Sequence, residues 1–147
     1  MKAHYLGHVV FYVRDLTVAG EFYRDLLGFS EVGSWPGIAM ALTAGRTHHE
    51  ILLIEVGDAP GPPQHHRLGL YHIGIKVGDS LDELRAVRDE LTAAGVPIEG
   101  MSDHTVTQSL YLRDPDGNEV ELYVDADPAI WKDDPAAVMA AIKPLRL

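Results

Sequence analysis

One stretch of the chain occurs twice. The segment LGHVVFYVRDL at 6–16 resembles LYHIGIKVGDS at 70–80, and the alignment matches His8 with His72. Both copies are rich in β-branched and aromatic residues and end in turn-forming residues, which is typical of a strand. A repeat of this kind indicates one unit of secondary structure used twice, and it constrains the fold more than any other feature of the sequence.

A helix is predicted after each copy. In the first half, Asp15 is a good N-cap, apolar residues with helical spacing follow it, and Gly28 ends the pattern. In the second half, SLDE at 80–83 is a capping-box signature, and an apolar stripe continues to Gly95. The stripes consist of Val18, Ala19, Phe22, Tyr23, Leu26 and Leu27, and of Leu84, Val87, Leu91 and Ala94.

Three further strands are predicted after each helix. They are expected at 29–33, 38–43 and 50–56 in the first half, and at 98–102, 108–113 and 119–125 in the second. The segment DPDGN is a strong turn signal between the last two strands. The expected order is therefore strand, helix and three strands, twice.

The predicted fold class is α+β, with two tandem βαβββ modules that form a cup-shaped mixed sheet. The predicted parts are a first module at 6–56, a Pro- and Gly-rich linker at 57–69, a second module at 70–125 and a C-terminal extension at 126–147, within a single domain of residues 1–147. The extension contains Trp131 and a short helical candidate, PAAVMAAI. It is expected to fold over an edge or the mouth of the cup.

Composition excludes several classes of function. The chain has 12 Lys and Arg against 22 Asp and Glu, a formal net charge of −10, so neither nucleic acid nor an anionic membrane is an expected partner. It has no cysteine, which removes disulfides, thiolate ligands and cysteine nucleophiles and fits a cytoplasmic location. No signal-peptide pattern and no membrane-spanning apolar run is found. Eight histidines remain as candidates for metal binding and proton transfer.

Two histidines and a carboxylate occupy related positions. Because side chains alternate along a strand, His8 and His72 converge if their matching strand faces both point into the cup. The last predicted strand carries Glu119 and Glu121 on one face, where a charge is costly unless it is paired or bound to a metal. A single strand histidine is more often a hydrogen-bonded core residue, and a single glutamate is often solvated. The joint pattern favours a metal site inside the cup, with the facial triad typical of non-haem Fe(II).

The segments GHVVFYVRD, YHIGIKVGD and DPDGNEVELYV resemble the vicinal oxygen chelate superfamily. That group includes glyoxalase I, fosfomycin-modifying enzymes, bleomycin-binding proteins and type I extradiol dioxygenases. The resemblance covers nearly the whole chain, and it implies a metal held by His8, His72 and Glu121. It is less specific for the reaction, because one fold hosts several chemistries.

Within this superfamily the chain most resembles a one-domain type I extradiol dioxygenase. Aligning EILLIEV with EVELYVD places Leu52 where glyoxalase I usually has a fourth ligand, a glutamate. THHEILL resembles the segment that carries a catalytic histidine in extradiol dioxygenases, and the spacing favours His49 over His48. Tyr111 and the upstream His104 match two further positions of that group, with a slightly shorter interval between them than is usual.

The resemblance implies an extradiol (meta) ring-cleaving dioxygenase, which inserts both atoms of O2 into a catechol. Fe(II) is the expected cofactor, and Mn(II) accepts the same ligands. His49 would act as an acid–base group, and Tyr111 with His104 would handle the proton of the catechol. The expected partners are a small aromatic diol and O2, and the expected assembly is a homodimer.

Three alternatives stay open. A metal-dependent thiol transferase of the fosfomycin-resistance type would use the same ligands without needing His49 or Tyr111. A glyoxalase-type lyase or isomerase is disfavoured by Leu52, which replaces its fourth ligand. A metal-free small-molecule-binding protein of the same fold would need none of the ligands. The sequence leaves open which catechol is cleaved and what the C-terminal extension does.

Overall fold

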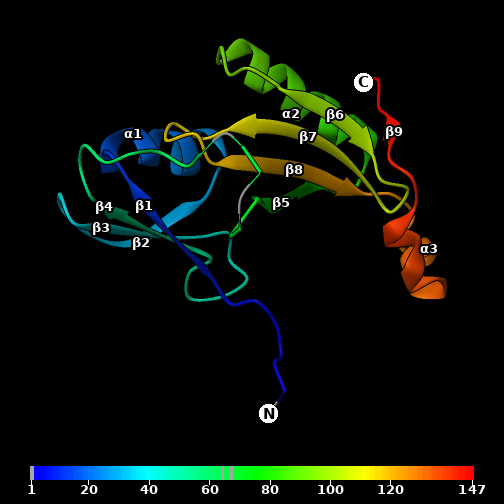
Figure 1. Cartoon of the computed structure of the whole chain (residues 1–147), viewed down its shortest axis with the longest axis horizontal. Coiled ribbons are helices and arrows are strands. Elements are labelled where there is room, and N and C mark those ends of the chain that lie inside the picture. Colours follow the sequence, from blue (N-terminus) through cyan, green and yellow to red (C-terminus); the bar gives the residue numbers. More distant parts are fainter. Residues whose placement is uncertain (1, 64, 67) are drawn as a thin grey trace. The chain divides into compact units, whose positions relative to one another are not determined.

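The structure is a computed structural model, and it describes residues 2–63, 65–66 and 68–147. The chain divides into two compact units (Figure 1): Met1–Gln64 with Asp114–Gly117, and His65–Arg113 with Asn118–Leu147. Each unit has its own sheet. The predicted linker at 57–69 contains Gln64 and Arg67, which lie outside the described residues.

The first unit is a four-stranded sheet with one helical segment. Its elements are β1 (Val9–Val13), α1 (Leu16–Gly20), η1 (Glu21–Leu26), β2 (Ser30–Trp35), β3 (Ala39–Thr43) and β4 (Ile51–Glu55). The strand order is β1-β4-β3-β2, with β1 parallel to β4 and the other neighbours antiparallel. The Asp15 carboxylate caps α1 by accepting from two backbone N–H groups, and Gly28, with φ +80°, follows the helical segment.

The second half of the first predicted helix is a π-helix, which the sequence pattern did not indicate. In η1 the backbone N–H of Leu27 donates to the carbonyl of Phe22 at 3.0 Å. The wider turn reduces the angle between consecutive side chains, so the adjacent aromatics Phe22 and Tyr23 both enter the core. The buried Tyr23 hydroxyl donates to Asp114 at 2.8 Å, and this bond ties the DPDGN turn to the first unit.

The second unit repeats this plan and adds an extension. Its elements are β5 (His72–Gly78), α2 (Leu81–Ala93), β6 (Gly100–Asp103), β7 (Thr107–Arg113), β8 (Glu119–Asp125), α3 (Pro128–Asp133), η2 (Pro135–Met139) and β9 (Lys143–Pro144). The strand order is β5-β8-β7-β6-β9, with β5 parallel to β8. Ser80 caps α2 by accepting from the Glu83 N–H, and the Glu83 carboxylate reaches back to accept from the Asp79 N–H at 2.8 Å, one residue before the N-cap.

The shared topology confirms the predicted α+β fold with two βαβββ modules. His8 lies immediately before β1 rather than inside it. In the extension, the helical candidate is a short 3-10 helix, η2, and β9 pairs with β6, so the extension folds over an edge of the second sheet. The cup shape and the single domain concern the placement of the two units, and they stay predictions. None of the helices in the described ranges is both long and apolar enough to cross a membrane.

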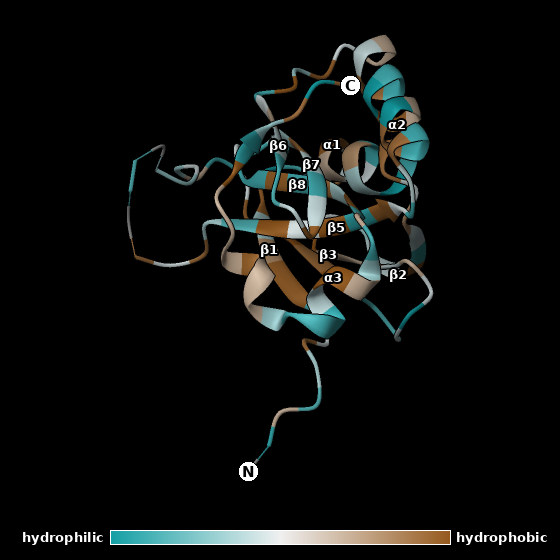
Figure 2. Ribbon diagram, turned by 90° about the vertical axis from the view of Figure 1, so that its right-hand side faces the viewer, coloured by the Kyte–Doolittle hydropathy of each residue, from teal (hydrophilic) through white to brown (hydrophobic). Residues whose placement is uncertain are grey.

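The second sheet has one apolar and one polar face. On β8, Val120, Leu122 and Val124 are fully buried on the side that packs against α2, where Leu84 and Leu91 are buried as well. Hydrophobic colouring accordingly follows the strands, whereas α2 is largely hydrophilic (Figure 2). The residues between these positions on β8 therefore point to the opposite face of the sheet, which carries the candidate site.

Candidate functional site

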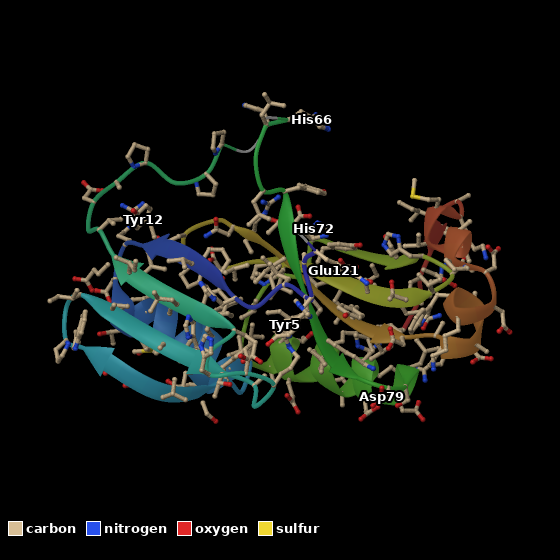
Figure 3. The ribbon with its side chains drawn as sticks, turned by 90° about the horizontal axis from the view of Figure 1, so that it is seen from below. Tyr5, Tyr12, His66, His72, Asp79 and Glu121 are labelled. Atoms are coloured by element: carbon tan, nitrogen blue, oxygen red, sulfur yellow. The ribbon has the colours of Figure 1, made fainter. Side chains whose placement is uncertain are left out.

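The polar face of the second sheet is built by β5 and β8, which run parallel and side by side. The register places His72 opposite Glu119 and Gly74 opposite Glu121. Figure 3 shows His72 and Glu121 close to each other. A Cβ at Gly74 would lie 3.4 Å from the Tyr123 ring and 3.6 Å from the Glu121 carboxylate, so both side chains lie over this position of β5. The expected placement of Glu119 and Glu121 on one face of their strand is therefore seen, and His72 lies beside them.

The His72 imidazole lies between two carboxylates. Its Nδ1 is 3.2 Å from Glu119 Oε1, and its Nε2 is 3.1 Å from Glu121 Oε2. Glu119 is buried, and it also accepts from Arg113 Nη2 at 3.1 Å and from the Tyr71 hydroxyl, whose pKa is raised by that bond. Because carboxylates only accept, Nδ1–H donates to Glu119 in this arrangement. The opposite nitrogen, Nε2, then faces a second acceptor.

Two acceptor atoms that are 3.1 Å apart need a proton or a metal ion between them. Two metal ligands with bonds of about 2.1 Å at right angles stand about 3.0 Å apart, so His72 and Glu121 fit neighbouring positions on one metal. Within the described part of the chain, no three His, Asp or Glu side chains are grouped so as to hold a metal. The third expected ligand, His8, belongs to the other unit.

One predicted catalytic residue, Tyr111, contacts Glu121, and a second, His104, contacts Tyr111. Tyr111 lies opposite Glu121 in the β7–β8 register, and its hydroxyl donates to Glu121 Oε1 at 3.1 Å. His104 Nε2 is 2.6 Å from the same hydroxyl, so the ring nitrogen donates to the oxygen that has given its proton to Glu121. Burial, and then the charge of Glu121, raise the pKa of Tyr111. His104, Tyr111 and Glu121 therefore form one hydrogen-bonded series.

His104 is presented by a turn of unusual backbone geometry. The next residue, Thr105, has φ +73°, which is rare for a β-branched residue. The Asp103 carboxylate stabilises the turn by accepting from the Thr105 N–H at 2.7 Å, and the His104 N–H donates to the Thr107 carbonyl at 2.8 Å. The turn also explains how the imidazole reaches Tyr111 although the interval between them is short.

Three histidines gather in the first unit. The rings of His8 and His49 are 4.5 Å apart between centroids, and the Nδ1 atoms of His48 and His49 are 2.6 Å apart. His48 is exposed, whereas His49 is half-buried. Burial, followed by the charges of His48 and His8, lowers the pKa of His49, so its imidazole is neutral at pH 7 and can accept a proton.

The β3–β4 turn that carries His48 and His49 is organised by Glu50. This carboxylate accepts from the backbone N–H groups of Ala44, Arg46 and Thr47 and from the Thr43 hydroxyl, at distances between 2.9 and 3.1 Å. Burial alone would raise the pKa of Glu50, but these bonds outweigh it and lower the pKa. Sequence analysis aligned Glu50 with Glu119 without assigning it this role. A glutamate that directly follows the small and polar segment AGRTHH was the available signal.

We expect Glu50→Gln to lower the free energy of unfolding by about 1 to 2 kcal/mol at pH 7, because three backbone N–H groups of the turn and the Thr43 hydroxyl lose a charged acceptor. The pKa of Glu50 is lower in the folded chain, so its stabilisation is full above pH 4.5 and is lost as the pH falls through the lowered pKa. Urea unfolding at several pH values measures this. The control is the exposed Glu21→Gln, and an equal loss in both variants would contradict the prediction.

Leu52 occupies the position in the first unit that Glu121 occupies in the second. Leu52 pairs with Val10 in the parallel β1–β4 ladder, as Glu121 pairs with Gly74 in β5–β8. The structural register therefore agrees with the sequence alignment, and the first unit has no carboxylate at this position. Sequence analysis named Glu121 as the expected ligand through the resemblance and gave Glu119 no role, because the contact of Glu119 depends on which nitrogen of the His72 ring it reaches.

The fold and these residues define a two-module α+β protein with a histidine and carboxylate face. The chain belongs to the Glyoxalase/Bleomycin resistance protein/Dioxygenase superfamily, whose pattern matches residues 5–122. The superfamily predicted from the sequence is confirmed.

Curated relatives include dioxygenases. The chain is 33% identical over 130 residues to a catechol-2,3-dioxygenase of Bacillus subtilis, covering 88% of this chain and 45% of that protein. It is 35% identical over 127 residues to biphenyl-2,3-diol 1,2-dioxygenase 3 of Rhodococcus globerulus, covering 82% of this chain and 63% of that protein. The chain thus spans less than two thirds of the length of each of these relatives.

Solved structures with the same fold include proteins that are named for other activities. A lactoylglutathione lyase from Agrobacterium tumefaciens has a TM-score of 0.65 and 28% identity, over 84% of this chain and 96% of that chain. A glyoxalase/dioxygenase from Nostoc punctiforme has a TM-score of 0.72 at 17% identity, over 84% and 92%. The second likeness concerns the fold alone.

Proposed function

We propose that this chain is an extradiol ring-cleaving dioxygenase that inserts both atoms of O2 into a catechol-type diol. Fe(II) would be held by His72 and Glu121 of the second unit and by His8 of the first. The observation that carries the proposal is the His72 ring, whose Nδ1 is engaged by Glu119 while Nε2 faces the acceptor Glu121 at 3.1 Å. His8 is proposed from its match to His72 in the repeat.

The bound Fe(II) would supply Lewis acidity and open positions for the diol and O2. Proton handling would fall to the chain's own side chains. Tyr111 and His104 form a hydrogen-bonded series that ends at Glu121, so they would orient the diol and accept the proton of one hydroxyl. The neutral imidazole of His49 would accept and return a proton at the reacting oxygen. The expected product is a ring-opened aldehyde or ketone of the 2-hydroxymuconic type.

Glu119 is proposed as the residue that orients His72. It would fix the ring tautomer by accepting from Nδ1–H, as carboxylates next to metal-bound histidines commonly do. We expect Glu119→Ala to weaken metal binding by about 10- to 100-fold, and Glu119→Gln, which keeps an acceptor oxygen, to weaken it less. Mn(II) titration followed by electron paramagnetic resonance measures this.

The matched control for Glu119 is Glu99→Gln. Glu99 pairs with Nε of the same Arg113 at 2.9 Å, whereas Glu119 pairs with Nη2 of Arg113 and also contacts His72. The Mn(II) affinity of the Glu99→Gln variant should stay within about twofold of that of the unsubstituted chain. Wild-type affinity in Glu119→Ala would refute the orienting role.

The lyase alternative is supported by the similarity to the Agrobacterium structure and opposed by Leu52, which leaves only one carboxylate of the matched pair. The thiol transferase and the metal-free binding protein have no comparable support, because neither requires the series from His104 through Tyr111 to Glu121. The dioxygenase is therefore the function that the site supports best.

The deciding experiment reconstitutes the protein anaerobically with Fe(II), and in parallel with Mn(II), before adding a panel of catechols in air. Oxygen uptake with formation of a yellow ring-fission product is the expected result. The hemithioacetal of methylglyoxal and glutathione serves as the substrate of the lyase alternative. Isomerisation of that compound without oxygen uptake on any catechol would overturn the proposal. Light scattering on the same samples tests the expected homodimer.

A further inference from the structure

The turn between β6 and β7 contains an unusual backbone conformation. Among the residues that the structure describes, Thr105 alone of the non-glycine residues has a positive φ, at +73°. A β-branched side chain disfavours this conformation, which persists where neighbouring contacts enforce it. Thr105 directly follows His104, whose Nε2 is 2.6 Å from the Tyr111 hydroxyl. The strained residue is therefore next to a candidate catalytic histidine.

Asp103 holds the strained residue from within the turn. Its carboxylate accepts from the Thr105 N–H at 2.7 Å, a side-chain turn that favours this backbone conformation. The His104 N–H donates to the Thr107 carbonyl at 2.8 Å and closes the turn. Asp103 thus acts on the residue that determines the direction in which the chain leaves His104.

The C-terminal extension fixes both sides of this turn. On one side, the Ala126 N–H donates to the Val106 carbonyl at 2.9 Å. On the other side, β9 lies alongside β6 with Lys143 opposite Asp103 (Figure 1). Because both sides are held, the turn has little room to relax as a whole. A change in the Thr105 backbone would instead move His104, which lies between the two fixed sides.

The position of the turn matters for the site. The turn continues into Val106 and Thr107, which line a cavity of about 430 Å³ together with Glu121 and Trp131. The series from His104 through Tyr111 ends at the same Glu121. A shift of His104 would therefore break this series at its outer end and leave the contact between Tyr111 and Glu121 in place.

We propose that Asp103 is a positioning residue: its carboxylate holds Thr105 in the left-handed conformation and thereby keeps His104 within hydrogen-bonding distance of Tyr111. The expected effect on turnover rests on the proposed function, because it assumes the role of this series in ring cleavage. The effect on the hydrogen bond between His104 and Tyr111 does not depend on the reaction.

Nuclear magnetic resonance on the metal-free, full-length chain tests the hydrogen bond directly. The histidine rings are labelled with 15N, and the ring N–H proton of His104 is assigned by its loss in His104→Phe. We expect this proton to give a resonance in the unsubstituted chain, because Nε2 donates to Tyr111 at 2.6 Å. Asp103→Ala should lose the resonance, and Asp103→Asn, which keeps an acceptor oxygen, should retain it.

A second substitution provides a rescue. Glycine adopts a positive φ without the steric cost of a β-branched side chain, so Thr105→Gly removes the need for the Asp103 carboxylate. The double variant that combines Asp103→Ala with Thr105→Gly should therefore regain the His104 resonance. A general loss of stability caused by Asp103→Ala would not be corrected in this way, because glycine adds conformational freedom to the unfolded chain.

The matched control is Asp15→Ala in the first unit. The Asp15 carboxylate accepts from the N–H of Thr17, two residues further along, at 2.7 Å, which is the same contact that Asp103 makes with Thr105. Asp15→Ala therefore removes an equivalent bond far along the chain from His104. It should leave the His104 resonance unchanged.

Steady-state kinetics with the Fe(II)-loaded protein provide the second measurement. Asp103→Ala should lower kcat for catechol about 10- to 100-fold, because a displaced acid–base group loses its alignment. KM and iron content should stay within about twofold, since the proposed ligands and Tyr111 are intact. Asp15→Ala should retain kcat. Thermal unfolding shows which variants are folded, and if Asp103→Ala is not, the presence or absence of the His104 resonance in the double variant decides.

The outcomes separate the positioning role from the proposed function. The positioning role would be overturned by a His104 resonance that persists in folded Asp103→Ala, by its absence from the unsubstituted chain, or by a folded double variant that lacks it. Loss of the resonance in Asp103→Ala and its return with Thr105→Gly, without oxygen uptake by the unsubstituted chain on any catechol, would support the positioning role and refute the dioxygenase instead.

Discussion

Glu121→Ala is expected to lose stoichiometric Fe(II) and at least about 1,000-fold in ring-cleaving turnover, because several kcal/mol of metal assistance disappear together with the metal. The substitution removes the oxygen that faces His72 Nε2 and the acceptor of the Tyr111 hydroxyl, so the metal and the proton-handling series are affected at once. Iron content after anaerobic reconstitution and desalting, together with oxygen uptake, measures both effects.

The control for Glu121 is Glu90→Gln, an exposed position on α2. It changes the net charge by the same amount and should retain iron and turnover. His8→Ala complements the pair, since His8 is the proposed ligand from the first unit and its loss should also release iron. Stoichiometric iron in a folded Glu121→Ala or His8→Ala protein would refute that ligand assignment.

His49→Phe is expected to keep its iron and to lose about 100- to 10,000-fold in turnover, the range that an acid–base residue commonly contributes. Phenylalanine fills a similar volume without a nitrogen that can accept a proton. The lowered pKa keeps the His49 imidazole neutral at pH 7, which is the form required for this role. Single-turnover measurements with iron-loaded protein separate the chemical step from metal loss.

The adjacent His48 provides a matched control for His49. Its side chain is more exposed, although its Nδ1 is 2.6 Å from that of His49. His48→Phe should therefore change turnover by less than about tenfold. Equal losses in the two variants would mean that the pair acts as a structural unit, and full turnover in iron-loaded His49→Phe would refute its role outright.

Local patterns predicted most of the elements. Asp15 and the SLDE segment marked helix starts because capping depends on residues a few positions apart, and both caps are present. The π-helix at Glu21–Leu26 was not predictable in the same way. Its wider turn lets Phe22 and Tyr23 both enter the core, and that demand comes from packing against the rest of the unit rather than from the segment itself.

The candidate site was likewise predictable from the sequence only in part. Alternation along a strand is a property of the backbone, so Glu119 and Glu121 were expected on one face before their surroundings were known. The partner of each glutamate depends on the β5–β8 register and on the orientation of the His72 ring, which arise from contacts between distant segments. The link from His104 to Tyr111 likewise needs the Thr105 turn, whose positive φ no sequence pattern indicated.

By itself, the sequence determined that the chain has two βαβββ modules with matching histidines and a mid-strand carboxylate, because repeats and strand alternation can be recognised from the spacing of residues. Only the tertiary structure decided that Glu119 reaches Nδ1 of His72 while Glu121 faces Nε2. It also decided that Trp131 lines a cavity together with Glu121. The physical reason is that strand register, ring orientation and the path of the extension are set by hydrogen bonds and packing between residues far apart in the chain.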